Sequence, residues 1–309
     1  MAGRDIDAVV QQASAAFNLL FEEAAKTAKP DYLKVATVVP SVSASTGYGF
    51  LQEYPMMKEW VGERMLKLLE NRDYSIKNRL YESSIQVKRT DFEDNDYGKY
   101  GPLFAEMGMQ SALYPDEHIF GLLKDGDKTV CLDGQNFFDK EHPLSEGTTG
   151  CNLFIASTGS GDSATPYTGP AWYLLDLSRV LKPLLWQERV KPAIESTVPR
   201  GQNVSSDVFL SDRILFGTRA RGNAGFTLWQ LGAMAKMPLN SDTLNQVYTA
   251  MTQFKTDSGR PMNVRPTMLV VPTALRNDAR KLLDREYLEN GESNPDYKLL
   301  DYLVTPWLD

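Results

Sequence analysis

The regular spacing of apolar residues near the N-terminus is the feature that most restricts the fold. Residues 5–29 carry an apolar side chain at every third or fourth position, among them Val10, Phe17 and Phe21. This spacing predicts one amphipathic helix of about six turns, which ends where Lys29 precedes Pro30. Because helices of this kind gain most of their stability by packing their apolar face, we expect the chain itself or a neighbouring copy to cover that face.

A second pattern predicts a polar ribbon. Tyr81, Ser83, Ile85 and Val87 alternate with polar or charged residues, and a period of two is typical of a half-exposed strand. Together with residues 65–69, on the other side of a polar stretch, we interpret this segment as a long two-stranded arm. Since an isolated ribbon is only marginally stable in water, we expect the arm to lie on another subunit.

The candidate contact residues between subunits come from these two segments. They combine the apolar face of the N-terminal helix with the region around the ribbon tip: Val10, Phe17, Phe21, Arg72, Asp73, Tyr74, Lys77 and Arg79. Two projecting segments that each need a covering surface favour a subunit that assembles with copies of itself.

The rest of the chain mixes helical and extended patterns. The patterns predict a strand over 33–39, two consecutive helices over 97–124 with a break at Tyr114-Pro115, a Gly- and Ser-rich loop over 145–170, short strands between 172 and 218, and a hairpin turn over 219–225. Trp172, Trp186 and Trp229, with Tyr173 and Phe226, are predicted to pack in the β core.

The closing part of the chain alternates helix and strand. We predict helices over 241–254 and 273–288, and strands over 267–271 and 299–304. This alternation is typical of a small α/β lobe, and the chain as a whole is therefore predicted to have an α+β fold.

The composition excludes several classes of protein. The chain has 309 residues, of which 42% are hydrophobic and 24% charged, with a formal net charge of -7, and this is ordinary for a globular protein of about two domains. The acidic balance opposes general nucleic-acid binding, which depends on Lys and Arg. No apolar run approaches the roughly 20 residues of a membrane-spanning helix, and the first residues lack the pattern of a secretory signal. We therefore expect no membrane association and a cytoplasmic location.

Few residues suggest chemistry. His118 and His142 are the only histidines, and each follows a glutamate, so a metal-dependent hydrolase built from them and nearby carboxylates is an open alternative. Neither lies in the helical spacing that directs two imidazoles at one ion. Cys131 and Cys151 match neither a redox nor a zinc spacing, so we expect two buried free thiols. We predict no catalytic, cofactor-binding or metal-binding residue.

A string of short motifs carries a resemblance to a known family. Residues 133–139 read Asp-Gly-Gln-Asn-Phe-Phe-Asp and are followed by His142-Pro143, and further matches occur in the same order between about residues 48 and 285. These matches lie at 48–55, 58–62, 74–76, 91–94, 115–117, 122–126, 182–183, 187–189, 191–192, 226 and 229–230. In these motifs the chain resembles the Mu-like phage and prophage major head subunit, the gpT family.

The resemblance implies a structural protein with the tailed-phage major capsid fold. Its parts would be an N-terminal arm over 1–47, an E-loop over 48–92, a P-domain with a long spine helix over 93–230, and an A-domain-like lobe over 231–309. The family implies hexamers and pentamers in an icosahedral shell around double-stranded DNA, with portal and scaffold proteins as partners. The location would be the virion, after assembly in the host cytoplasm. A non-viral, encapsulin-like compartment is a further alternative.

Overall fold

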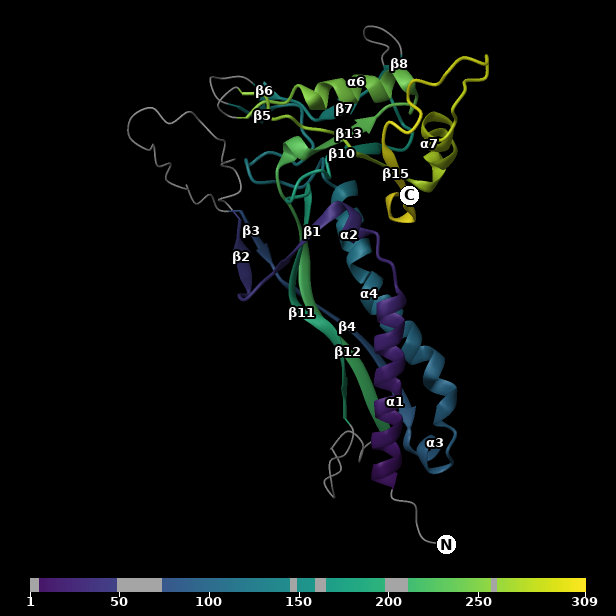
Figure 1. Ribbon diagram of the computed structural model, residues 1–309. Helices are drawn as coiled ribbons and strands as arrows, with labels where there is room; N and C mark the ends of the chain where they lie inside the picture. Colours follow the sequence, from purple (N-terminus) through teal and green to yellow (C-terminus); the bar gives the residue numbers. More distant parts are fainter. Residues whose placement is uncertain (1–5, 49–73, 145–148, 159–164, 198–210, 257–259) are drawn as a thin grey trace.

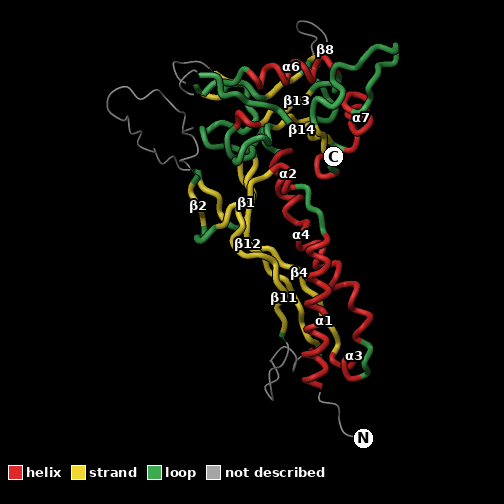
Figure 2. The backbone as a smooth tube through the Cα atoms, in the orientation of Figure 1, coloured by secondary structure: helices red, strands yellow, loops and turns green. Residues whose placement is uncertain are grey.

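The chain forms an elongated stalk with a wider lobe at one end (Figures 1 and 2). The computed structural model describes residues 6–48, 74–144, 149–158, 165–197, 211–256 and 260–309. The start of α1 lies at the tip of the stalk, and the C-terminus lies beside the lobe (Figure 1). Among the described residues, none of the helices combines the length and the apolar character needed to cross a bilayer.

A four-stranded sheet runs along the stalk. Its strands, in spatial order, are β1 (Ala36–Pro40), β11 (Leu184–Ser196), β12 (Arg213–Phe226) and β4 (Arg79–Lys88). β1 is parallel to β11, whereas the β11–β12 and β12–β4 pairs are antiparallel. Residues 219–225, predicted to form a hairpin turn, lie instead inside β12. The pairing of β12 with β11 continues through them, and the pairing with β4 continues as far as Gly222.

Two long helices lie along this sheet, α1 (Ile6–Thr27) and α4 (Gly101–Lys124). The predicted N-terminal helix is thus present, and its apolar face is buried within the same chain. Val10, Phe17 and Phe21 are only 1%, 2% and 4% exposed. The Phe17 ring stacks on Phe104 of α4 at 4.0 Å and meets Phe216 of β12 edge-on at 5.6 Å between ring centroids.

The predicted break at Tyr114-Pro115 is wrong, because α4 continues through Pro115 as one helix. A proline inside a helix removes one backbone hydrogen bond, but Ile119 and Phe120 beyond it are fully buried, and their burial outweighs that loss.

Asp116 does not begin a new helix. Its carboxylate accepts hydrogen bonds from the backbone N–H groups of Asp31 (3.1 Å) and Tyr32 (2.7 Å), where helix α2 (Tyr32–Val35) begins.

The predicted strand over 81–88 is present. It belongs to β4, which pairs with β12 from Arg79 opposite Gly222 to Lys88 opposite Arg213. A separate short ribbon consists of β2 (Ser45–Gly47) and β3 (Ser75–Lys77). Residues 65–69 and the candidates Arg72 and Asp73 lie outside the described residues.

The lobe contains a five-stranded sheet. Its strands, in spatial order, are β15 (Asp301–Val304), β14 (Met268–Val271), β10 (Trp172–Leu175), β13 (Gly232–Lys236) and β7 (Leu153–Ile155). The sheet therefore crosses the domain boundary predicted at residue 231. The prediction of a continuous loop over 145–170 is wrong, because the strands β6 to β9 lie within it, between Thr149 and Pro166. The sequence pattern did not predict β7, because a strand of three residues is too short to show a period. The strand forms through its pairing with β13.

The remaining elements are short. They are α3 (Arg89–Glu93), η2 (Tyr97–Tyr100), β5 (His142–Pro143), β6 (Thr149–Gly150), β8 (Ser157–Thr158), β9 (Thr165–Pro166), η5 (Trp229–Leu231), α6 (Ser241–Thr252), η6 (Thr273–Leu275), α7 (Arg276–Leu283) and η7 (Pro306–Leu308). The segment predicted as a strand over 33–39 divides into α2 and β1. The predicted aromatic core is confirmed, because all five of its members are at most 5% exposed.

A glycine sets the distance between α1 and α4. A Cβ atom at Gly108 would lie 2.8 Å from the carbonyl carbon of Phe21, in the backbone of α1. We expect Gly108→Ala to lower the free energy of unfolding by about 1–3 kcal/mol, because backbone rather than a flexible side chain must move. Gly121→Ala, in the same helix but with open space around its Cβ, is the control and should be neutral or stabilising by about 0.5–1 kcal/mol. Urea unfolding of both variants checks this, and equal stability would contradict it.

The Asp116 carboxylate connects α4 to the segment that follows α1. Burial raises the pKa of this carboxyl, although its backbone hydrogen bonds oppose the increase. We expect Asp116→Ala to lower the free energy of unfolding by about 1–3 kcal/mol, because two backbone N–H groups lose their acceptor. Replacement of the exposed neighbour Glu117 by Ala is the control. An unchanged urea midpoint for Asp116→Ala would show that the connection is not stabilising.

Candidate functional site

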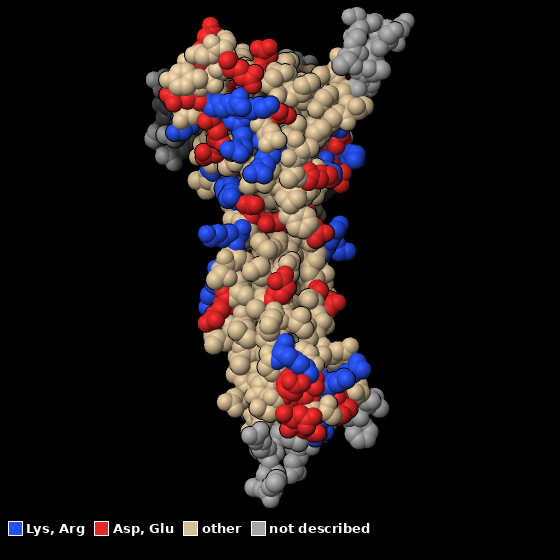
Figure 3. All heavy atoms as spheres, turned by 90° about the vertical axis from the view of Figure 1, so that its right-hand side faces the viewer, with Lys and Arg blue, Asp and Glu red and all other residues tan. Residues whose placement is uncertain are grey.

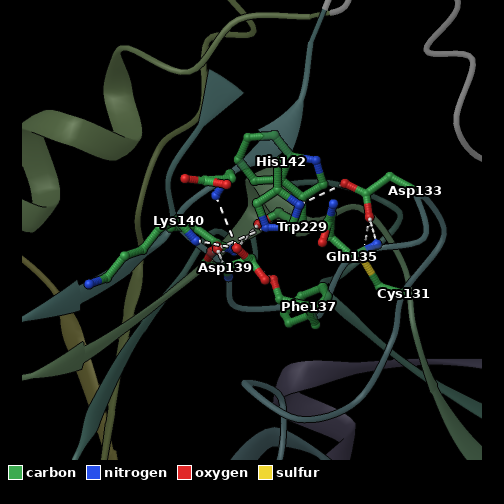
Figure 4. Close-up of polar contacts among 11 residues, drawn as sticks. Cys131, Asp133, Gln135, Phe137, Asp139, Lys140, His142 and Trp229 are labelled. Atoms are coloured by element: carbon green, nitrogen blue, oxygen red, sulfur yellow. Dashed lines mark hydrogen bonds and ion pairs between the residues drawn. The ribbon is translucent and has the colours of Figure 1, made fainter. Parts of the chain in front are cut away.

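A buried polar cluster lies where the segment after α4 meets the lobe (Figure 4). Asp133 accepts hydrogen bonds at Oδ1 from the backbone N–H of Gln135 (3.0 Å) and from the Cys131 thiol (3.1 Å). Its Oδ2 lies 2.6 Å from Nδ1 of His142. The His142 side chain is fully buried, and its ring stacks on Trp229 with 4.0 Å between centroids and an interplanar angle of 3°.

The electrostatics of the cluster follow from these contacts. Burial alone would raise the pKa of Asp133, but hydrogen bonds from His142 and Cys131 hold it below its ordinary value. Burial and the nearby Asp133 carboxylate raise the pKa of the Cys131 thiol, so the thiol stays protonated at neutral pH. A protonated thiol is a poor nucleophile.

The same cluster contains the side-chain types of a metal site. Potential ligand atoms of Cys131, Asp133 and His142 lie within 4.8 Å of one another. However, the 2.6 Å between Nδ1 and Oδ2 is the separation of a charge-assisted hydrogen bond. Two ligands bound at about 2.0–2.2 Å to one tetrahedral ion stand further apart. The geometry is that of a hydrogen-bonded cluster.

Sequence reasoning identified His142 but not its partners. The neighbours considered from the sequence were Glu141 and Asp139, whereas the carboxylate beside the ring belongs to Asp133. The available signal was the motif over 133–139, which ends three residues before the histidine. The expected free thiols are present, although only Cys131 is buried and Cys151 is partly exposed.

His118 lies in a different environment. It projects from α4 into an aromatic group, with its ring parallel to Trp186 at 6.2 Å and tilted against Tyr81 at 4.6 Å. Burial lowers the pKa of its imidazole. Since His118 and His142 contact different sets of residues, the structure does not form the two-histidine centre that the hydrolase alternative requires.

The candidate contact residues divide into buried and exposed groups. Val10, Phe17 and Phe21 are buried within the chain itself. The Tyr74 hydroxyl accepts a hydrogen bond from the backbone N–H of Phe226 (2.9 Å), and burial raises its pKa to about 12. Lys77, at the end of β3, and Arg79, at the start of β4, are exposed. The last two are therefore available to a neighbour.

The lowered pKa of Asp133 predicts a dependence of stability on pH. A carboxyl whose pKa is lower in the folded chain stabilises it fully above the ordinary value of 3.8, and this contribution disappears as the pH falls through the folded value. We therefore expect wild type to exceed Asp133→Asn in free energy of unfolding near pH 7, and the difference to shrink below pH 3.8. Urea unfolding at a series of pH values tests this, with Asp94→Asn as an exposed control. A difference independent of pH would contradict it.

Comparisons with known proteins agree along nearly the whole chain. The family described as Mu-like prophage major head subunit gpT matches residues 10–308. The major capsid protein of Escherichia phage Mu is 40% identical over 273 residues, which cover 88% of each chain. The Mu-like prophage FluMu major head subunit of Haemophilus influenzae is 37% identical over 270 residues, which cover 87% of each.

Solved structures give the same result for the fold. The chain is similar to a subunit of the bacteriophage JBD30 procapsid, with a TM-score of 0.82, 44% identity, and 97% of this chain and 99% of that one covered. Similarity to the JBD30 capsid gives a TM-score of 0.75 at 34% identity, with 94% of each chain covered. The stalk, its long helix and the lobe are thus the parts of a tailed-phage capsid fold. The chain belongs to the Mu-like prophage major head subunit gpT family and is a structural capsid protein, not an enzyme.

Proposed function

We propose that the chain assembles into hexamers and pentamers of a closed icosahedral shell that encloses double-stranded DNA. The observation that carries this proposal is the similarity to a JBD30 procapsid subunit over 97% of the chain. A phage capsid protein is part of the virion, and we propose that assembly takes place in the host cytoplasm with scaffold and portal proteins. The family match favours this role over an encapsulin-like compartment, which would enclose protein instead of DNA.

We assign the capsid domains by the two sheets. The stalk, with α4 as the spine helix, forms the P-domain, and the lobe around the five-stranded sheet forms the A-domain. Because β7 and β10 belong to the sheet of the lobe, the A-domain includes part of the segment before residue 231. Residues 1–47 include the N-terminal arm, with α1, although β1 joins the sheet of the stalk. Residues 48–92 include the E-loop region, and we place its base at the ribbon of β2 and β3.

The face of α1 that points away from the core is one proposed contact surface. No charged residue occurs between Asp7 and Glu22, and Leu19 of α1 and Leu103 of α4 are 58% and 51% exposed. Figure 3 shows few charges along the middle of the stalk, whereas charges gather on the lobe and around the stalk tip. The buried residues Val10, Phe17 and Phe21 hold the arm on its own chain, so a neighbour would contact the opposite face.

The charge of the chain supports enclosure of DNA without strong binding. A net charge of -7 and a largely uncharged stalk face offer few cations to the phosphates. A strongly basic lining would bind packaged DNA at many sites and resist its release. We therefore propose contact with DNA that is not specific for sequence.

Lys77 and Arg79 at the base of the ribbon are proposed to contact a neighbouring subunit. We expect the double variant Lys77→Glu/Arg79→Glu, produced with its neighbouring head genes, to remain folded but form no closed shells, because reversed charges repel the partner surface. Negative-stain electron microscopy and sedimentation velocity provide the readout. The variant Lys77→Arg/Arg79→Lys keeps both charges and should assemble. Normal shells from the Glu variant would exclude these two residues from the contact.

A further inference from the structure

The orientation of the Asn152 side chain determines where His142 carries one of its protons. The Asn152 Nδ2 group faces three backbone carbonyl oxygens, those of Phe137 (2.8 Å), Gly232 (3.0 Å) and Trp229 (3.2 Å). Its Oδ1 accepts the backbone N–H of Asp139 (2.9 Å). Reversing the amide would place an oxygen against carbonyls, so Oδ1 is the atom that faces His142. Because His142 Nε2 lies 3.0 Å from this acceptor, Nε2 carries a hydrogen.

The Asp133 carboxylate determines the state of the other nitrogen. Its Oδ1 already accepts hydrogen bonds from Gln135 and Cys131, and both stabilise the ionised form. Oδ2 lies 2.6 Å from His142 Nδ1. If Nδ1 carried no hydrogen, its lone pair would face an ionised oxygen at that distance and the two would repel. A hydrogen on Nδ1 turns the same contact into a short, charge-assisted hydrogen bond.

The surroundings can hold the resulting positive charge. The His142 ring is parallel to the indole of Trp229 at 4.0 Å, an arrangement in which a cation is attracted to the electron-rich face. Three described residues contact the ring: Asp133 and Asn152 by hydrogen bonds and Trp229 by stacking. Of these three, only Asp133 carries a charge, and the Cys131 thiol beyond it is neutral. A buried charge that is paired and hydrogen-bonded on both sides meets the usual condition for its burial.

We propose that His142 is a buried imidazolium. The hydrogen bond from its Nδ1 proton to Asp133 holds the turn at 131–135 against the junction of the stalk sheet and the lobe sheet. Asp133 lies in that turn, Asn152 directly precedes β7, and Trp229 lies in η5, which connects β12 of the stalk sheet to β13 of the lobe sheet. Loss of the Nδ1 proton leaves two acceptors facing each other, so the turn separates from the junction. The stalk and the lobe are therefore joined by a proton-dependent contact.

The two histidines of the chain provide a direct test. Nitrogen NMR of the chain labelled with 15N-histidine should show two imidazole groups at pH 7, with His142 protonated on both nitrogens and His118 neutral. The environment of His118, half-buried among Tyr81, Tyr114 and Trp186, offers no carboxylate hydrogen bond among the described residues. His118→Phe assigns the signals and should leave those of His142 unchanged.

Asp133→Asn tests the contact between His142 and the turn at 131–135. Removal of the charge partner should convert His142 to the neutral form at pH 7, and amide hydrogen exchange should increase in segments 131–139 and 151–153 but not in α1. The wild-type spectrum alone decides the charge state, so the proposal stays testable if the variant folds poorly. A neutral His142 in wild type would overturn it. So would one zinc ion per chain bound at His142, found by elemental analysis of the protein.

Discussion

The contact between α1 and α4 is the packing interaction on which the stalk depends. The phenyl rings of Phe17, Phe104 and Phe216 come from α1, α4 and β12, and they form the centre of one small apolar cluster. Gly108 permits the backbone of α1 to lie directly against α4. Without this contact the apolar face of α1 would be exposed, which is costly in water.

This packing changes how assembly is understood. From the sequence, the apolar residues of the N-terminal helix are the natural candidates for contact with a neighbour. In the folded chain they are already buried. We therefore propose that a neighbour contacts the outer face of the helix, which carries no charge between Asp7 and Glu22. An arm held on its own chain can still contact a second subunit, and many modest contacts of this kind add up in a closed shell.

The second constraint is the junction between the two sheets. β12 passes through η5 into β13, so one continuous stretch of chain connects the stalk to the lobe. Trp229 lies on this stretch, and the ring of His142, from β5, stacks on it. Within the stalk, the carboxylate of Asp116 connects α4 to the segment after α1. Buried polar groups that are fully hydrogen-bonded favour one arrangement of neighbouring segments over others. The relative placement of stalk and lobe thus depends on a few polar contacts as well as on the apolar core.

The sequence by itself determined the local elements and the family. The period of side chains predicted α1 and the strand over 81–88, because periodicity reports which side chains share a face. The aromatic residue types predicted the aromatic core. The motif over 133–139 indicated the gpT family, which the comparisons confirm. The tertiary structure decided which segments meet: β4 pairs with β12, β7 forms the edge of the lobe sheet beside β13, and Asp133 lies against His142. It also decided that α4 continues through Pro115. Periodicity cannot predict which segments pair or which side chains meet, because pairing and burial depend on residues that are distant in the chain and come together only after folding.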